Sequence, residues 1–324
     1  MKAAIREEYG TVDVLQVKEM EVPTPKKDEV LVKVHCTTVN RTDCATVSGK
    51  PYIFRLFIGM FRPTLPITGT DFAGEIVAIG EDVSQFKTGD HVFGLNDEGL
   101  SSHAEYMTIK ETAAIAKISP TIKFSTAAAS AEGAHYSLNF LNKVEVNPGD
   151  KILVNGATGA IGSATIQLLK LKGVHVTAVC DTKNIELVKS TGVDKVISYE
   201  VEDFTKTEQK YDFVLDSVGK SRFKHCKRIL KEGGIYVSSE LGPFAENIFL
   251  ALKSMIFGSK KVIFPIPNNP RKSIKHMAQL LNDGKFNPFI DRIYPLYNIK
   301  EAFSYVQTGM KTGNVILKIA EESM

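Results

Sequence analysis

The sequence has few cysteines, and their spacing matches neither a metal-binding motif nor a disulfide framework. Four occur among the 324 residues, at positions 36, 44, 180 and 226, with no C-x-x-C pair. A zinc knuckle or a disulfide framework needs closely spaced or paired cysteines. We therefore interpret these thiols as reduced and mostly buried.

Long apolar runs are also missing. Residues 1–8 carry charges and lack the apolar core of a signal peptide. The most apolar later stretch, residues 247–258, is too short to cross a bilayer and contains Lys253. The sequence thus predicts no membrane-spanning segment, and we expect a cytoplasmic location.

Neither sign of charge dominates. Forty Lys and Arg residues against 37 Asp and Glu residues leave a formal net charge of +3, and no dense basic block occurs. This balance does not indicate a nucleic-acid partner. Hydrophobic residues make up 43% of the chain and occur throughout it, which excludes extended disorder. The length suggests about two domains.

Two patterns alternate along the chain. The first 120 residues or so contain short strands, turns and frequent prolines. From about residue 123, strands alternate with helices, which is typical of parallel βαβ units. After residue 266 the pattern is mixed again. We predict an α/β protein in which a doubly wound Rossmann domain (123–266) is inserted into a β-rich domain made of residues 1–122 and 267–324.

A glycine-rich turn follows one of the expected strands and opens a helix. Residues 155–162 read N-G-A-T-G-A-I-G, which departs slightly from the usual G-x-G-x-x-G fingerprint. Small residues let the backbone approach a pyrophosphate, which the first helical amides then hold. The alternative is a tight turn without a ligand, but its strand–turn–helix context favours a dinucleotide site. The predicted cofactor-binding residues here are Gly156, Ala157, Thr158, Gly159, Ala160, Ile161 and Gly162.

An acidic residue that binds the ribose 2′-hydroxyl is expected about 20 residues later. Asp181 lies 19 residues after Gly162 (181 − 162 = 19) and directly follows an apolar strand. It could instead cap the next helix. Lys183 could pair with a 2′-phosphate or be an ordinary surface lysine.

Short motifs in a fixed order link nearly the whole chain to a known family. They include V-N-R-T-D (39–43), G-T-D-F-A-G (69–74), C-D-T-K-N (180–184), D-S-V-G (216–219) and G-N-V-I-L (313–317). The chain resembles the medium-chain dehydrogenase/reductase superfamily, and within it the zinc-independent, zeta-crystallin-like quinone oxidoreductases. The resemblance implies a GroES-like catalytic domain beside the Rossmann domain, with the active site in the cleft between them. It also implies a homodimer joined through edge strands, for which the stretch from Lys261 to Pro265 is the candidate; an ordinary last strand is the alternative.

The comparison with zinc-containing members of that superfamily predicts that no metal is bound. Asn40, Thr70 and Ser130 stand at or near the positions where those members carry zinc ligands. Catalytic zinc needs three protein ligands and an open position.

The resemblance also implies the site residues. It places Asn40 beside the nicotinamide and the substrate, with Asp43, Tyr52 and Phe54 lining the same cleft; Asn40, Asp43 and Tyr52 are the expected catalytic residues. Tyr136 falls where relatives often have a threonine that touches the nicotinamide. The proton could come from Tyr52, from Tyr136 or from solvent, and Tyr52 could also simply pack. The other implied cofactor-binding residues are Asp181, Thr182, Lys183, Tyr199, Ser217, Val218, Gly219 and Asn314.

The leading functional prediction is an NAD(P)H-dependent reductase of quinones or α,β-unsaturated carbonyls. We predict a weak preference with both cofactors usable, and NADP(H) is narrowly favoured over NAD(H) only because the family resemblance favours it. Asp181 would repel a 2′-phosphate, whereas Lys183 and Tyr199 would favour one. The alternatives are an enoyl-thioester reductase of the same fold and a dinucleotide-binding protein without turnover.

Two loops, residues 49–66 and 242–267, are apolar and aromatic and predict a hydrophobic substrate entrance. Core or dimer-interface packing is the alternative. The aromatic residues concerned are Phe54, Phe57, Phe61, Phe244, Phe249, Phe257 and Phe264.

Overall fold

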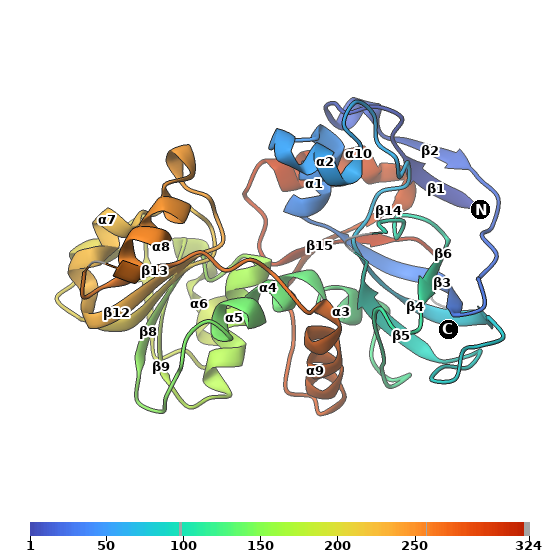
Figure 1. The fold of residues 1–324 in the computed structure, drawn as a ribbon. Coiled ribbons are helices and arrows are strands. Elements are labelled where there is room, and N and C mark those ends of the chain that lie inside the picture. The colour runs from blue at the N-terminus through green and yellow to red at the C-terminus, as the bar shows by residue number, and fades with distance from the viewer. Residues whose placement is uncertain (97–98, 257, 321–324) are drawn as a thin grey trace. The chain divides into compact units, whose positions relative to one another are not determined.

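The computed structural model describes residues 1–96, 99–256 and 258–320, and its contacts divide the chain into two units (Figure 1). One unit comprises Met1–Glu132 and Asn269–Met324, and the other comprises Gly133–Asn268. The sequence pattern placed these boundaries after residues 122 and 266. The first boundary lies later because helix α3 (Phe124–Ala128) packs on strands of the first unit, where Phe124 stacks on His35 with 4.4 Å between ring centroids.

The second unit contains a parallel sheet of six strands. Their order is β10-β9-β8-β11-β12-β13. The bounds are β8 (Lys151–Asn155), β9 (His175–Cys180), β10 (Lys195–Ser198), β11 (Tyr211–Asp216), β12 (Leu230–Ser238) and β13 (Lys261–Ile263). This order reverses direction between β8 and β11, as in doubly wound dinucleotide-binding domains. The predicted Rossmann sheet is confirmed.

One helix precedes these strands, and others connect them. They are α4 (Glu132–Leu141), α5 (Ala160–Lys170), α6 (Ile185–Lys189), α7 (Phe223–Cys226) and α8 (Glu246–Ile256). Helix α7 is short. It changes to a 3-10 turn at Lys227–Ile229, which brings Ile229 into the buried core beside Cys226.

The first unit contains a mostly antiparallel sheet of seven strands. The order is β14-β15-β3-β4-β5-β7, and β6 also pairs with β3. The bounds are β3 (Glu29–Val39), β4 (Asp71–Ile79), β5 (His91–Leu95), β6 (Tyr106–Lys110), β7 (Ala114–Lys117), β14 (Ile290–Pro295) and β15 (Asn314–Lys318). Because β15 pairs with β3, both ends of the chain build one sheet.

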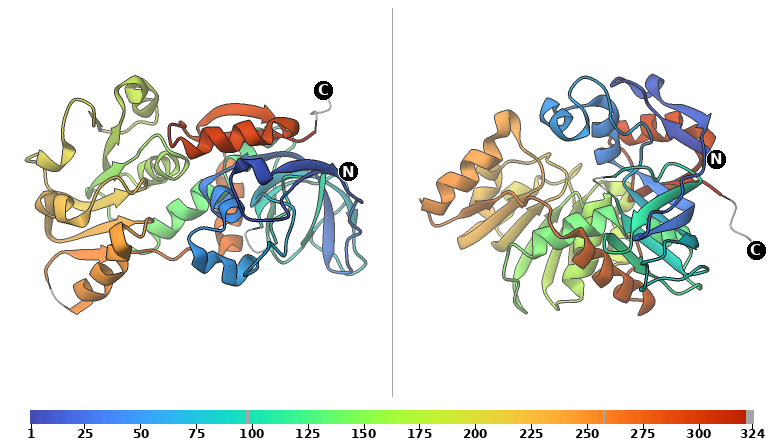
Figure 2. Two further views of the ribbon diagram at one scale, coloured as in Figure 1. Left: turned by 90° about the horizontal axis from the view of Figure 1, so that it is seen from above. Right: turned by 45° about the vertical axis from the view of Figure 1, so that its right-hand side comes forward.

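A small hairpin and several helices complete this unit. The hairpin strands are β1 (Lys2–Ile5) and β2 (Gln16–Glu19), and the helices besides α3 are α1 (Arg41–Ser48), α2 (Arg55–Ile58), α9 (Pro270–Asn282) and α10 (Ile299–Gln307). The N-terminal segment, in blue, lies against the red helix α10 in both views of Figure 2, and Leu15 shares a core with Phe303 of α10. Among the described helices, none is both long and apolar enough to span a bilayer.

Candidate functional site

Most of the predicted cofactor-binding residues follow the carboxyl ends of four neighbouring strands. Asn155 at the end of β8 pairs with Asp216 of β11 and with Val179 of β9, and Ser198 of β10 pairs with Cys180. The strands are parallel, so the segments that follow them emerge at one edge of the sheet. In doubly wound sheets, ligands bind at this edge, next to the point where the strand order reverses.

The three glycines of the turn between β8 and α5 differ in what the fold requires of them. Gly156 has φ +79°, and a Cβ there would lie 2.8 Å from the Val218 side chain. A Cβ at Gly162 would lie 2.0 Å from the carbonyl oxygen of Gly156. At Gly159 the nearest atom would be 3.6 Å away, and φ is an ordinary −68°. The fold itself therefore needs Gly156 and Gly162, whereas it leaves the position of Gly159 open for a ligand.

The start of α5 can hold an anion. In the described part of the chain no side chain caps this helix, and Thr158, Gly159, Ala160 and Ile161 are half-buried. The first amides of a helix lack intrahelical partners and carry partial positive charge. The residues of the turn thus fit the pyrophosphate of a dinucleotide.

Helix α4 packs against the turn and the start of α5. Ser137 Oγ donates to the carbonyl oxygen of Ile161 at 2.7 Å. A Cβ at Gly133 would lie only 2.9 Å from the Ala160 backbone, so the two helices approach closely. The predicted residue Tyr136 is half-buried on α4, and its ring makes an edge contact with His135.

Asp216 organises the loop after β11, a role that the sequence analysis missed. Its carboxylate is fully buried and accepts hydrogen bonds from Asn155 Nδ2 (3.0 Å), the Tyr236 hydroxyl (2.8 Å) and the amides of Val218 (3.3 Å) and Gly219 (3.0 Å). Burial raises the pKa of Asp216 even though these donors favour its ionised form. The network joins the end of β8 to the predicted loop residues. The signal in the sequence that could have identified Asp216 is an aspartate at the end of an apolar strand.

Ser217 follows Asp216 on the same loop. Its hydroxyl oxygen is buried, and within the described residues it has no hydrogen-bond partner. Buried polar groups are normally hydrogen-bonded. A polar group of a bound ligand would satisfy this hydroxyl, and the contact between Ser217 and the cofactor stays a prediction.

Two carboxylates lie where the adenosine ribose is expected. Asp181 accepts a hydrogen bond from Asn184 Nδ2 at 2.6 Å, and Lys183 Nζ lies 3.6 Å from it. Glu200, which the sequence analysis did not select, accepts from the amide of Thr182 at 3.0 Å. Burial, and then the charges of Asp181 and Glu200, raise the pKa of Tyr199. The acidic charge here is therefore larger than the sequence prediction assumed.

In the first unit, Asn40 and Asp43 form a capping box at the start of α1. The amide of Asp43 donates to Asn40 Oδ1 at 2.8 Å, and the amide of Asn40 donates to Asp43 Oδ2 at 3.0 Å. Such reciprocal bonds stabilise a helix start. Both residues are among those expected at the site from the sequence, whereas the helix that they begin is not evident in it. Both are buried.

Further buried polar groups surround this cap. His103 Nε2 lies 2.8 Å from the carbonyl oxygen of Thr38 and 3.9 Å from Asp43 Oδ2. Burial lowers the pKa of His103 to about 4, so the ring is neutral. Burial, followed by the charges of Asp71 and Glu132, raises the pKa of Asp43 well above its usual value.

The remaining predicted residues of this unit differ in exposure. Tyr52 is 66% exposed and can meet a ligand. Asn314 is buried at the start of β15, where its Nδ2 donates to the carbonyl oxygen of Phe289 at 3.0 Å.

Of the aromatic residues expected at the substrate entrance, Phe57, Phe61 and Phe249 are exposed and Phe264 is half-buried. Phe257 and the side chains of Phe54 and Phe244 lie outside the described residues.

Comparisons with known proteins agree with this architecture. Residues 26–120 match the family model for the alcohol dehydrogenase GroES-like domain, and residues 191–317 match that for zinc-binding dehydrogenases. The chain is 32% identical to a chloroplastic quinone-oxidoreductase homolog of Spinacia oleracea over 95% of both chains. It is 30% identical to a chloroplastic NADPH-dependent alkenal/one oxidoreductase of Arabidopsis thaliana, over 98% of this chain and 79% of that one. The structure matches a quinone oxidoreductase from Coxiella burnetii with a TM-score of 0.86, at 26% identity over 99% of both chains.

The chain belongs to the medium-chain dehydrogenase/reductase superfamily. The resemblance noted in the sequence is confirmed, and so is the predicted combination of a GroES-like unit with a Rossmann unit.

Asn40, Thr70 and Ser130, which the resemblance puts at or near the zinc-ligand positions of other members, carry amide and hydroxyl groups. Asn40 Nδ2 donates to Thr70 Oγ1 at 2.7 Å, and Ser130 Oγ donates to the carbonyl oxygen of Thr126 at 2.7 Å. Neither amide nor hydroxyl groups replace the thiolate, imidazole and carboxylate ligands of catalytic zinc. Over residues 1–96, 99–256 and 258–320, no group of three or more His, Cys, Asp or Glu side chains could hold a metal ion.

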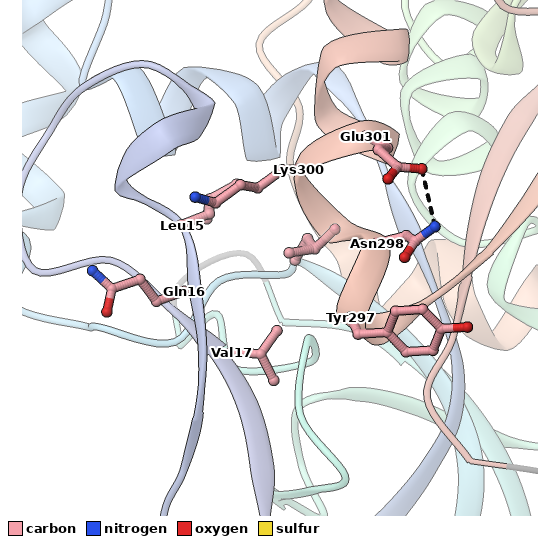
Figure 3. A pocket seen from close by; sticks show the side chains of 8 residues that line it. Leu15, Gln16, Val17, Tyr297, Asn298, Lys300 and Glu301 are labelled. Atoms are coloured by element: carbon pink, nitrogen blue, oxygen red, sulfur yellow. Dashed lines mark hydrogen bonds between the residues drawn. The ribbon is translucent and has the colours of Figure 1, made fainter.

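A surface recess of about 500 Å³ lies elsewhere in the GroES-like unit, between β2 and the start of α10 (Figure 3). Asn298 Nδ2 donates to Glu301 Oε2 at 2.9 Å beside it. Its lining includes none of the predicted superfamily site residues: it consists of Leu15, Gln16, Val17, Tyr297, Asn298, Ile299, Lys300 and Glu301. We assign it no role in the reaction.

Proposed function

We propose that this protein is an NAD(P)H-dependent, zinc-independent reductase of quinones or α,β-unsaturated carbonyls. The observation that carries the proposal is the turn at Gly159, which the fold leaves open at the place where a pyrophosphate approaches a Rossmann helix. The names of the relatives, a quinone-oxidoreductase homolog and an alkenal/one oxidoreductase, support the substrate class.

The residues of the Rossmann unit bind and orient the cofactor in this proposal. The turn around Gly159 and the amides that start α5 hold the pyrophosphate, and Asp216 fixes the loop from Ser217 to Gly219 beside it. The bound nicotinamide supplies a hydride, which carries two electrons. Rigid placement of this loop keeps the donor in a single orientation, and orientation is the main contribution a protein makes to such a transfer.

The residues of the GroES-like unit serve the acceptor and the proton transfer in this proposal. Quinones and enones are activated acceptors: the hydride adds to an electrophilic carbon, and a proton completes the reduction, so a metal Lewis acid is not required. Asn40 and Thr70 are hydrogen-bonded to each other and offer no metal ligand set. The exposed hydroxyl of Tyr52 or solvent supplies the proton in this proposal.

Both nicotinamide cofactors should serve, with a weak preference at most. One relative, the alkenal/one oxidoreductase of Arabidopsis thaliana, is named as NADPH-dependent. The carboxylates of Asp181 and Glu200 oppose a 2′-phosphate, which carries about −1.5 to −2 charge at neutral pH. Lys183 offsets part of this repulsion through its ion pair with Asp181 at 3.6 Å.

Cofactor oxidation at 340 nm tests the proposal. The purified protein is supplied with NADH or NADPH and with one of three acceptors: an apolar quinone, a short enone or a crotonyl thioester. Turnover with the quinone or the enone is expected. Turnover with the thioester alone would favour the enoyl-thioester reductase instead. Cofactor binding, seen as a change in nicotinamide fluorescence, without turnover on any acceptor would favour a binding protein.

We also propose a homodimer joined through β13. This strand ends the six-strand order of the sheet and pairs with β12 on its inner side. An edge strand offers its outer backbone groups to a second copy. Sedimentation equilibrium should give twice the chain mass. A monomeric wild type at micromolar concentration would contradict this.

A further inference from the structure

Residues 50–62, termed the 50–62 segment, form an unusually apolar surface in the GroES-like unit. The segment contains a 3-10 turn (Tyr52–Phe54), helix α2 (Arg55–Ile58) and the loop that follows. Six large apolar side chains in it are exposed: Tyr52 (66%), Ile53 (64%), Leu56 (61%), Phe57 (80%), Met60 (48%) and Phe61 (89%). Single exposed apolar residues are common, but a contiguous cluster marks an interaction surface.

Polar and cation–π contacts fasten this segment to its unit. The guanidinium of Arg55 stacks on Tyr9 at 4.4 Å and on Tyr52 at 4.9 Å, and Arg55 Nε donates to the carbonyl oxygen of Gly49 at 3.1 Å. The Tyr9 hydroxyl donates to the carbonyl oxygen of Gly59 at 2.6 Å. The segment is therefore held without burying its apolar side chains, which are left exposed to solvent.

The segment's own stretch of sequence carries charge of one sign. Between Asp43 and Asp71 the sequence contains no acidic residue and three basic ones, Lys50, Arg55 and Arg62. Lys50 and Arg62 are exposed. Exposed aromatic and aliphatic side chains flanked by cations are typical of protein segments that lie in the interface of an anionic bilayer.

We propose that the 50–62 segment docks the protein on the anionic surface of a lipid bilayer. Phe57 and Phe61, the two most exposed of these six apolar side chains, enter the boundary between headgroups and acyl chains, and Lys50 and Arg62 contact the lipid phosphates. This is a peripheral attachment, and it goes beyond the proposed reductase activity.

A second copy of the chain fits this surface less well. In a twofold symmetric contact the same patch occupies both sides, so the cations Lys50 and Arg62 of both copies would lie in one interface. Like charges brought together in this way oppose association. An anionic bilayer complements both the apolar side chains and the cations.

Co-sedimentation of the full chain with lipid vesicles tests the proposal. One set of vesicles is zwitterionic phosphatidylcholine, and the other contains about 30 mol% phosphatidylserine, a fraction chosen to give a clearly negative surface. Wild-type protein should bind the anionic vesicles and lose most of that binding in high salt. The double variant F57S/F61S should bind at least about tenfold more weakly, because two large side chains no longer leave water. Lys50→Gln and Arg62→Gln should each weaken binding to anionic vesicles about fivefold.

Phe249→Ser provides the matched control, because Phe249 is also exposed (69%) but lies on α8 in the Rossmann unit. It should bind vesicles as the wild type does. Circular dichroism and thermal unfolding establish that each variant is folded, and a misfolded double variant is replaced by the single variants F57S and F61S.

Several results would overturn the proposal. One is wild-type protein that ignores anionic vesicles. Another is an equal loss of binding in Phe249→Ser. A third is a shift of F57S/F61S to a smaller oligomer with vesicle binding unchanged, which would make the surface an interface between copies. A fourth is a higher KM for the quinone in F57S/F61S with vesicle binding unchanged, which would assign the segment to a substrate entrance. Vesicle binding is measured without cofactor or acceptor, so its failure would leave the proposed reductase activity standing.

Discussion

The same added methyl group should have opposite consequences at two glycines of one turn. The perturbations are Gly159→Ala and Gly162→Ala. At Gly162 the new Cβ would lie 2.0 Å from the carbonyl oxygen of Gly156 and 2.8 Å from its carbonyl carbon. Both neighbours are backbone atoms, so β8 and α5 would have to separate. Overpacking of this kind costs about 1–3 kcal/mol and occasionally more, and we expect the upper end of that range.

At Gly159 the added methyl group would meet no close neighbour in the protein. The nearest atom to the new Cβ is 3.6 Å away, which is an ordinary contact, and φ of −68° suits alanine. Alanine is a poorer residue than glycine at a helix N-cap, so a destabilisation of up to about 1 kcal/mol is expected. The methyl group would, however, occupy the position of the pyrophosphate. A loss of cofactor affinity of at least about tenfold, equal to about 1.4 kcal/mol, should follow.

Two measurements separate these effects. Urea unfolding without cofactor gives the free energy of unfolding of each variant, and fluorescence titration gives the affinity for NADH and NADPH. We expect the Gly159→Ala variant to be stable and to bind cofactor poorly. Wild-type affinity in Gly159→Ala would show that no phosphate approaches this backbone. Unfolding of Gly159→Ala as severe as that of Gly162→Ala would show that both glycines serve packing.

The remaining predictions concern cofactor choice, the buried network, metal and pH. Asp181→Ser should raise the NADPH-to-NADH ratio of kcat/KM by at least about tenfold, and Glu200→Gln by a smaller factor, because each removes a charge that repels the 2′-phosphate; unchanged ratios in steady-state kinetics would exclude both from the ribose site. Asp216→Asn should weaken cofactor binding about tenfold and lower stability by about 2–3 kcal/mol, since an amide replaces an acceptor of charge-assisted bonds; calorimetric titration and unfolding measure the two losses, and wild-type affinity would refute the positioning role. Prolonged treatment with o-phenanthroline should leave activity intact, and elemental analysis showing one essential zinc per chain would refute the proposed metal independence. Burial raises the pKa of Asp71 to about 6, so the contribution of Asp71 to the free energy of unfolding falls as pH rises from about 4 to 6. Burial lowers the pKa of His103 to about 4, so the contribution of His103 rises over the same range. Asp71→Asn should therefore steepen the rise of Tm between pH 4 and 6, and an unchanged slope would contradict this assignment.

The Rossmann unit could be predicted from the sequence because its signals are local. The apolar stretch at β8, the turn to Gly162 and the helix that follows are contiguous, and each depends on contacts between residues close in the chain. The same holds for Asp181, whose place at the end of β9 follows from counting residues. Such patterns survive in a single sequence because they reflect backbone geometry and burial of one face.

Helix α1 could not be predicted in this way. Its sequence, R-T-D-C-A-T-V-S, is rich in threonine and has a weak helical propensity. The capping box of Asn40 and Asp43 and the burial of Val47 beside Val306 of α10 stabilise it. Packing against the far end of the chain overrides the local preference. For the same reason α3 belongs to the GroES-like unit, although its position in the sequence adjoins the Rossmann strands.

The polar network of the cofactor site also required the tertiary structure. Asn155, Asp216 and Tyr236 are 61 and 20 residues apart in the chain, and only the parallel pairing of β8, β11 and β12 brings them together. Glu200 reaches the predicted ribose site because β10 pairs with β9. The sequence by itself thus determined where the backbone can receive a dinucleotide, since that depends on small residues in one short turn. Which side chains hold the turn in place and what charge surrounds it were decided by strand pairing between distant segments.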